Sequence, residues 1–374
     1  MAIGAATAAI VALSNVIGGQ FPRFENAGTI YALLDPQNTS VGEVPNPQEG
    51  RNAGLVTKDA GDGKPIVKIR HYQRSVADTA TEPGCEGNPI APVEKQHKIT
   101  LYRQTSFSID HAEASGLMND AAKVFASGRA NDGAGYSLQN TGIMQEVHAK
   151  TMAVMPKLVE DINKDLVTKL ATRFGMNKRT GANTAKDYAF YKANGDLNPR
   201  AVAELLTDYR TNNLTGRPIV IGGAEIDILS HLLGWGNMAA SGVDFSKVAG
   251  TSKMNMYYDL VADAVLGADN FAILAPGIAK LSTYNRWEGQ FAKKHGNSTY
   301  GQFTLPEFGN QLRFDLQAKE EDCANPKTTF IISLYYDLYT PEDIYKPFDA
   351  TVGAKNDAYA GVNGIFRGRL TTAV

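Results

Sequence analysis

The side chains best suited to acid–base chemistry and metal binding are scattered along this chain. None of the histidines pairs with another His or Cys at the spacing that a zinc site uses. Glu146-Val147-His148 lacks the two-histidine helical motif of metalloproteases, and His111 is similarly isolated. We therefore expect a structural role for every histidine, namely His71, His97, His111, His148, His231 and His295.

Two glycine-containing segments are candidates for phosphate binding. Gly222 and Gly223 follow the apolar run 218–221, in the position of a phosphate-binding loop after a strand. The complete sequence pattern of such a loop is absent, so the indication is weak. The segment Asp132-Gly133-Ala134-Gly135 does not follow a strand and is expected to be an ordinary loop.

The acidic residues and the cysteines also lack a recognisable site pattern. Asp259, Asp263 and Asp269 do not have the spacing of a calcium loop. The run Glu320-Glu321-Asp322 is typical of a solvated turn. Cys85 and Cys323 lie far apart without a CxxC pattern and are expected to be two reduced thiols. We expect no catalytic, cofactor-binding or metal-binding residue, and hence not an enzyme.

Composition indicates an ordered globular chain with little net charge. Of 374 residues, 43% are hydrophobic, and 37 Lys and Arg oppose 39 Asp and Glu. Such balance argues against a protein whose main task is to grip nucleic acid, since those proteins carry a clear basic excess. Residues 2–19 are uncharged and rich in Ala, but they lack the basic start of a signal peptide and are interrupted by polar residues. We expect residues 2–19 to form an arm that packs on another surface, such as that of a neighbouring subunit. We also expect a soluble protein without a membrane span.

The first third of the chain is expected to be extended. Residues 35–65 are rich in Pro, Gly, Asn and Asp, which is typical of a loop or arm. Apolar and polar residues then alternate in 65–72 and again in 99–109, with the turn-rich segment 78–93 between them. This pattern predicts one long β-hairpin, poorly buried within its own subunit.

A long amphipathic helix is the strongest helical prediction. Residues at helical spacing in 137–174 are apolar, and charged residues occupy the other faces. Pro156 should either kink this helix or begin its second half. Gly175 should end it, as a glycine commonly does just after a helix. The apolar positions are Val159, Ile162, Leu166, Leu170 and Phe174.

A mixed α/β region and a second hairpin are expected in the rest of the chain. A helix from Asn198 to about Arg210 should precede a buried strand at 218–223 and a helix at 224–233, followed by helical or strand segments at 259–266 and 270–277. The alternating run 312–319 and the β-branched, aromatic run 328–339 should pair as a hairpin in a buried sheet.

This order of parts resembles the major capsid proteins of tailed bacteriophages, which have the Hong Kong 97-type fold. The segments Arg217–Gly223 and Gly267–Gly277 also look like stretches of these coat proteins. The resemblance implies an α+β fold with the following parts: an N-terminal arm (1–54), an extended β-hairpin called the E-loop (55–110), a peripheral domain with the long spine helix (111–199), a mixed α/β axial domain (200–305) and C-terminal strands that return to the peripheral domain (306–374).

The resemblance implies a function in self-assembly. The subunit would form hexamers and pentamers of an icosahedral shell that encloses phage DNA without sequence-specific binding, in a virion assembled in the host cytoplasm. A separate scaffolding protein, a portal and accessory or cement proteins would be its other partners, and no catalytic residue or cofactor carries over. Three alternatives are an encapsulin-type compartment shell, another phage structural protein such as a tail tube or sheath subunit, and an α/β enzyme with a small-molecule site near Gly222.

Overall fold

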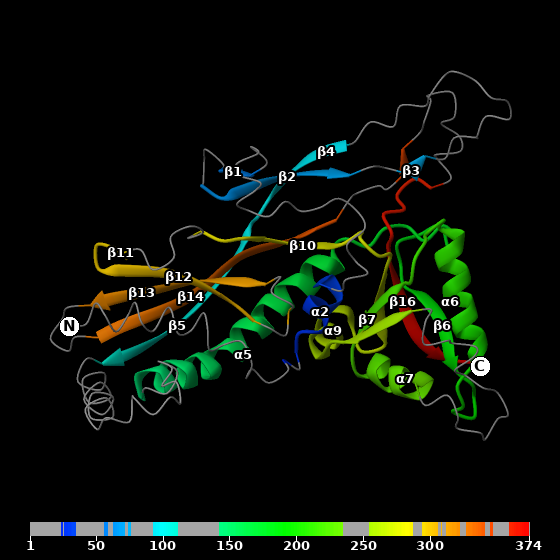
Figure 1. Cartoon of the computed structure of the whole chain (residues 1–374). Helices are drawn as coiled ribbons and strands as arrows, with labels where there is room; N and C mark the ends of the chain where they lie inside the picture. Colours follow the sequence, from blue (N-terminus) through cyan, green and yellow to red (C-terminus); the bar gives the residue numbers. More distant parts are fainter. Residues whose placement is uncertain are drawn as a thin grey trace, which may run out of the picture. The chain divides into compact units, whose positions relative to one another are not determined.

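A computed structural model gives the structure of the chain (Figure 1). It describes residues 24, 26–34, 56–58, 63–71, 74–75, 93–110, 142–234, 254–286, 294–305, 308, 312–321, 327–340, 345–346 and 359–373. The expected arm 2–19, both cysteines, His111 and the glycine-containing segment 132–135 lie outside these residues. The fold is a mixture of helices and strands, which confirms the predicted α+β class.

The chain divides into two compact units that each combine distant segments. The first unit contains residues 1–24, 99–162 and 283–336, and the second contains 25–98, 163–282 and 337–374. Helix α5 (Gly142–Ala171) and strand β14 (Lys327–Tyr339) each have residues in both units.

The first unit is built on a long antiparallel sheet. The strand order is β10-β14-β13-β12-β11, and β5 pairs with β14. Strands β13 and β14 form the predicted C-terminal hairpin, in register from Asp315 opposite Ser333 to Glu321 opposite Lys327. The remaining strands of this sheet are β5 (Leu101–Asp110), β10 (Lys280–Tyr284), β11 (Lys294–His295), β12 (Ser298–Thr304) and β13 (Arg313–Glu321).

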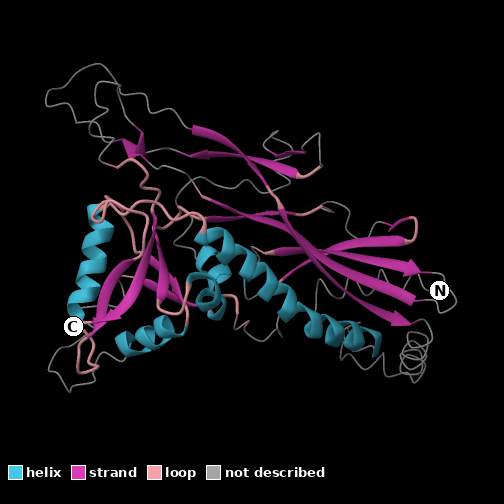
Figure 2. Cartoon of the chain, turned by 180° about the vertical axis from the view of Figure 1, so that it is seen from behind, coloured by secondary structure: helices cyan, strands magenta, loops and turns pink. Residues whose placement is uncertain are grey.

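One face of this sheet is apolar, because alternate residues of each strand point to the same side. Phe107 stacks on Phe330 and Phe303 stacks on Phe314, each pair facing across neighbouring strands. Helix α5 runs alongside β5 and β14 in both views, and Lys150 of the helix donates a hydrogen bond to the Ser108 carbonyl of β5 (Figures 1 and 2). The buried apolar side chains of this face are Ile109, Phe303, Phe314, Leu316, Ala318, Phe330, Ile332 and Leu334.

The two alternating segments expected to form one hairpin do not pair with each other. Strand β2 (Pro65–His71) pairs instead with β4 (Val93–Lys98), from Ile66 opposite Lys98 to His71 opposite Val93, and β1 (Val56–Lys58) adds a third strand. Strand β5 pairs with β14 over ten residues. The alternation correctly marked strands, but the pairing prediction was wrong because alternation specifies which side chains share a face and not which strand lies alongside.

Strand β2 and the residue that follows β4 are also better buried than expected. Val67 and Ile69 of β2 are only 2% and 1% exposed, and Ile99 just after β4 is fully buried. This part of the predicted hairpin therefore packs within its own chain. We call β2 and β4 together the ribbon.

The second unit contains a five-stranded mixed sheet with helices around it. Its strand order is β6-β16-β9-β7-β8, with parallel pairing of β16 to β6 and of β7 to β8. Helix α6 contacts β6, while α2, α7 and α9 contact β7 or its neighbours (Figure 2). The bounds are α2 (Gly28–Leu34), β6 (Lys186–Tyr191), α6 (Pro199–Thr211), β7 (Ile219–Gly222), α7 (Ala224–Gly234), β8 (Asn255–Tyr258), α9 (Leu260–Leu266), β9 (Asn270–Leu274) and β16 (Ile365–Thr372), with β3 (Arg74–Ser75) and β15 (Tyr345–Lys346) forming a separate parallel pair.

An aromatic cluster fills the core of this second sheet. The ring of Phe271 lies 5.9 Å from that of Tyr188 and 6.3 Å from that of Phe190. Gly368 on the neighbouring strand faces Phe271, and a Cβ there would lie 2.3 Å from the ring. A glycine is required at this position because the aromatic ring occupies the space of a side chain.

The long helix forms as one element, although it ends earlier than predicted. Pro156 lies inside α5, and Val159, Ile162, Leu166 and Leu170 are all at most 1% exposed. The last helical residue is Ala171, so Gly175 does not end the helix. A Cβ at Gly175 would lie 2.2 Å from the Asn363 side-chain oxygen, and its glycine is explained by this close approach.

The smaller elements of the α/β region match their predicted positions closely. Asn198 caps α6 by accepting a hydrogen bond from the Arg200 backbone N–H, as expected for an N-cap asparagine. Segment 259–266, predicted as either helix or strand, is helical in α9. None of the described helices combines the length and the apolar character that crossing a membrane would require.

Candidate functional site

The predicted phosphate-loop glycines lie at the start of α7, where a carboxylate of the same chain is already bound. Asp263 of α9 accepts a hydrogen bond from the Ala224 backbone N–H, at 3.0 Å, through Oδ2. A Cβ at Gly223 would lie 1.6 Å from the other oxygen of this carboxylate. The second glycine is therefore explained by the approach of Asp263. Because this carboxylate occupies the positive end of α7, a phosphate would meet like charge there.

A second carboxylate of α9 is fully buried and has a structural arrangement. Asp259 caps α9 and accepts hydrogen bonds from the Val261 backbone N–H, from Thr29 on α2 and from Asn163 on α5. The amide side chain of Asn163 also accepts from the Ile30 backbone N–H. Five donor contacts surround this carboxylate, which joins three helices and leaves little capacity for a ligand.

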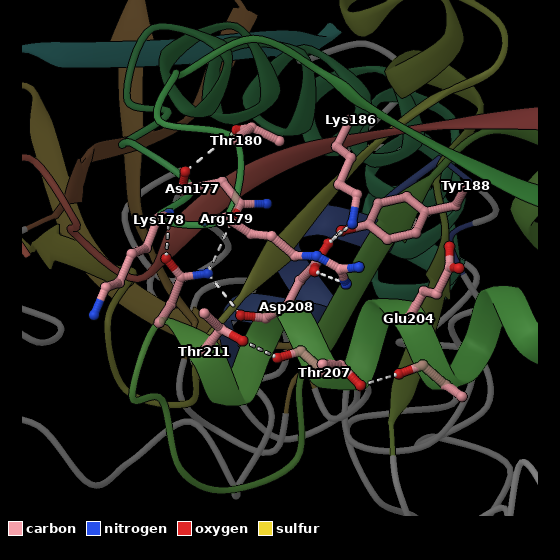
Figure 3. Close-up of polar contacts among 12 residues, drawn as sticks. Asn177, Lys178, Arg179, Thr180, Lys186, Tyr188, Glu204, Thr207, Asp208 and Thr211 are labelled. Carbon is pink, nitrogen blue, oxygen red and sulfur yellow. Dashed lines mark hydrogen bonds and ion pairs between the residues drawn. The ribbon is translucent and has the colours of Figure 1, made fainter.

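The densest charged cluster of the second unit centres on Asp208 of α6 (Figure 3). Its carboxylate is fully buried and forms ion pairs with Lys186 of β6 and with Arg179, the latter at 2.7 Å. The hydroxyl of Tyr188, two residues along β6 from Lys186, donates a hydrogen bond of 2.7 Å to the same oxygen as Lys186. Helix, strand and loop are thus tied to one buried negative charge.

The electrostatics of this cluster favour a static ion pair over proton transfer. Burial, followed by the charge of Asp208, raises the pKa of the Tyr188 hydroxyl far above its usual value. Tyr188 therefore stays protonated and acts as a donor. The single negative charge of Asp208 faces the positive charges of Lys186 and Arg179, and both of its oxygens are engaged. Such an arrangement can hold elements together but has no free base to offer.

Sequence reasoning overlooked Asp208, although a signal for it exists. Val202, Leu205 and Tyr209 form the buried stripe of α6, and Asp208 falls on the same stripe. A carboxylate at a core position of an amphipathic helix indicates a buried partner, because an unpaired buried charge is very costly. Lys186 could be suspected as that partner only after β6 is known to lie against α6.

Among the described residues, the histidines and the remaining acidic residues do not gather into one site. His231 is exposed on α7 and lies 3.5 Å from Asp227 of the same helix. His97 lies on β4 with its ring edge toward Tyr339. Within the described residues, no group of three or more His, Cys, Asp or Glu side chains has the geometry of a metal site.

The second face of the long sheet in the first unit is polar. The strand registers place Gln104, Ser333, Asp315 and Gln302 in one row across four strands. Gln302 donates a hydrogen bond of 3.1 Å to Asp315, and the Arg286 backbone N–H donates another to the same side chain. We call this surface the polar face; its further members include Tyr102, Ser106, Ser108, Gln317, Thr329, Ile331 and Tyr335.

The polar face is most exposed along β5. Tyr102 is 39% exposed and packs its ring 4.5 Å from that of Tyr335, and Gln104, Ser106 and Ser108 are also exposed. Burial raises the pKa of the Tyr102 hydroxyl, so it is neutral at physiological pH. The centre of this face therefore presents hydrogen-bonding groups with few charges, a composition that suits protein–protein contact.

Comparisons with known proteins return similarity in structure only. No protein-family model matches the chain, and no curated protein matches it significantly. The capsid asymmetric unit of cyanophage A-1(L) is 13% identical with a TM-score of 0.45, covering 88% of this chain and 93% of that one. The capsid of Ralstonia phage GP4 is 9% identical with a TM-score of 0.38, covering 85% of each chain.

A virus-like particle from Pyrococcus furiosus is 12% identical with a TM-score of 0.37, covering 91% of this chain and 98% of that one. Over most of its length, the chain is thus similar to capsid structures of phages and to this particle.

Proposed function

We propose that this chain is the major capsid protein of a tailed phage, which assembles with many copies of itself into an icosahedral shell around DNA. The observation that carries the proposal is the form and order of its elements. A ribbon precedes one 30-residue helix, an α/β unit follows it, and C-terminal strands return to both sheets. The resemblance noted from the sequence assigns this order to the Hong Kong 97-type shell fold.

Under this proposal, each described element has a place in the shell fold. Helix α5 would be the spine helix of the peripheral domain, and β7, β8 and β9 with α6 and α7 would belong to the axial domain. The ribbon would be the start of the E-loop. Scaffolding, portal and accessory proteins would be additional partners, and the virion would assemble in the host cytoplasm.

The physical properties of the polar face and the low net charge of the chain support the proposal of self-assembly. It is backed by an apolar face and lies on strands that pair over seven to ten residues, so its side chains have a rigid base. A rigid surface loses less conformational entropy when it is covered by another subunit. With 37 basic against 39 acidic residues, identical copies can also approach without strong mutual repulsion.

The direct test is electron microscopy of the purified full chain, alone and co-expressed with a scaffolding protein from the same genome. We expect closed particles of uniform diameter. A stable monomer in both preparations, over a range of salt and protein concentration, would refute the proposal. Tubes without closed ends would favour the tail-tube alternative instead.

A charge placed on the polar face tests whether this surface is used. We expect Ser106→Arg to leave the subunit folded, because surface substitutions usually change stability by about 0.5 kcal/mol or less. Its assembly into particles should drop strongly, since an unpaired charge is costly to bury between subunits.

Ser106→Thr is the matched control, because it keeps the hydroxyl and suits a strand. Particle yield by light scattering and subunit folding by circular dichroism distinguish the outcomes. Equal particle yield from the two variants would show that the polar face stays exposed in the shell.

A further inference from the structure

The ribbon carries a histidine whose surroundings suit the neutral ring and oppose its charged form. His97 of β4 lies directly opposite Val67 of β2, so both side chains point to the same face of the ribbon. Val67 is 2% exposed, and Ile99, two residues beyond His97, is fully buried. The imidazole therefore belongs to the buried face by which the ribbon packs on its own chain.

The His97 ring contacts an aromatic ring, and one of its nitrogens lacks a hydrogen-bond partner among the described residues. The ring lies 5.4 Å from that of Tyr339 at an angle of 73°, an edge-to-face arrangement. Its Nε2 atom is buried and finds no hydrogen-bond partner among the described residues. A neutral ring can leave one nitrogen as a bare acceptor, whereas a protonated ring places an N–H donor on both nitrogens. Protonation would therefore bury a positively charged donor without an acceptor.

Charged groups on the neighbouring elements do not compensate for this. Asp337 of β14 attracts a charged imidazole, but its Oδ1 already accepts hydrogen bonds from Lys169 of α5, at 2.5 Å, and from the Leu338 backbone N–H. Lys169 in the last turn of α5 and Arg173, two residues beyond its end, both repel a charged imidazole. One carboxylate thus faces two cations before the histidine is protonated.

We propose that His97 is an acid-sensitive latch, whose protonation releases the ribbon from the end of α5 and from β14 while the rest of the fold stays intact. The ribbon is suited to such local release because the side chains of Val67 and Ile69 and the Nε2 atom of His97 are buried on one of its faces, next to the ring of Tyr339. This inference concerns the subunit itself and does not depend on the proposed shell function.

The direction of the pH dependence follows from the state of the ring. Burial lowers the pKa of His97 below its ordinary value of 6.5, and the two cations add to this effect against the attraction of Asp337. The released ribbon would have a histidine of ordinary pKa. The packed ribbon is therefore fully favoured above pH 6.5 and loses stability as the pH falls through 6.5 toward the lowered pKa.

Hydrogen exchange followed by mass spectrometry tests the latch on the full chain. Protection factors, corrected for the intrinsic exchange rate, are compared at about pH 7.5 and about pH 5, on either side of an ordinary histidine pKa. We expect amides of β2 and β4 to lose protection at least tenfold at the lower pH. Amides of α6, which lies away from any histidine of the described residues, should keep theirs.

Two variants decide whether His97 is responsible. His97→Phe and His97→Gln cannot be protonated, and whichever folds at neutral pH should keep ribbon protection at about pH 5. His231→Gln, which removes an exposed histidine, should behave like the wild type.

The proposal would be overturned if, at about pH 5, the ribbon of the variants lost as much protection as that of the wild type. Loss of protection throughout the molecule would overturn it as well. If neither variant folds, the imidazole titration of the wild type by NMR decides. In that case, six histidines that all titrate at or above pH 6.5 would overturn it as well.

Discussion

Removing the charge of Asp208 should destabilise the second unit by an amount that its surroundings allow us to work out. Asp208→Asn keeps the side-chain shape and an oxygen that can accept a hydrogen bond from the Tyr188 hydroxyl, so this hydrogen bond is largely preserved. The Lys186 ammonium loses its counter-charge, and its side chain is only 16% exposed. Breaking a buried ion pair by removing one partner costs about 3–5 kcal/mol.

The partial exposure of Lys186 reduces this figure. Its ammonium can shift toward water along a flexible stem, so we expect a smaller cost of about 2–4 kcal/mol. Arg179 adds little, since its side chain is 44% exposed and water solvates it once the carboxylate is gone. Urea unfolding of the dissociated full chain should then show a midpoint lowered by about 0.5–1 M at an unchanged slope.

Asp187→Asn, on β6 next to Lys186, is the matched control. Asp187 pairs with Arg369 through two hydrogen bonds of 2.7 and 2.8 Å, but both side chains are about half exposed. The Arg369 guanidinium lowers the pKa of Asp187, so this pair is charged at neutral pH as well. Solvent screens such exposed pairs, and their loss changes stability little. A shift for Asp208→Asn no larger than that for Asp187→Asn would refute the argument from burial.

Two further substitutions test packing. Leu166→Ala should destabilise the chain by about 2–5 kcal/mol, because Leu166 is fully buried on α5. Thermal unfolding should show this loss by comparison with Thr168→Ala, which changes an exposed residue of the same helix. Equal effects of the two substitutions would contradict the burial of this helix face. Gly223→Ala should cost about 1–3 kcal/mol in urea unfolding, because its methyl group must displace the Asp263 carboxylate. A neutral result there would mean that the Asp263 contact with α7 does not restrict residue 223.

Local patterns in the sequence predicted most elements, because the signals for them are local. Pro199 and the cap at Asn198 mark the start of α6, and the helical spacing of Val159, Ile162 and Leu166 marks the buried face of α5. Strand β14 is equally clear from its run of β-branched and aromatic residues. Each of these signals depends on residues within a few positions of one another.

Pairing between distant segments could not be predicted in the same way. Strand β5 has the alternation expected of a partner for β2, yet it lies against β14, more than two hundred residues away. The strand that pairs with β2 in place of β5 is β4. Its sequence is Val-Glu-Lys-Gln-His-Lys, which shows little apolar alternation. Its position is determined by pairing with β2 and by the packing of His97, which are tertiary effects.

The glycines and acidic residues near Gly222 illustrate why a pattern can suggest a site where the structure has a packing contact. A helix that begins directly after a strand needs a small residue for close approach and a negative group for its free N–H donors. In a nucleotide-binding protein the ligand supplies that negative group. Here Asp263 supplies it from α9, and Asp259 similarly satisfies the first turn of its own helix. Because a carboxylate from the chain takes the place of the phosphate, the start of α7 has a negative partner without a bound ligand.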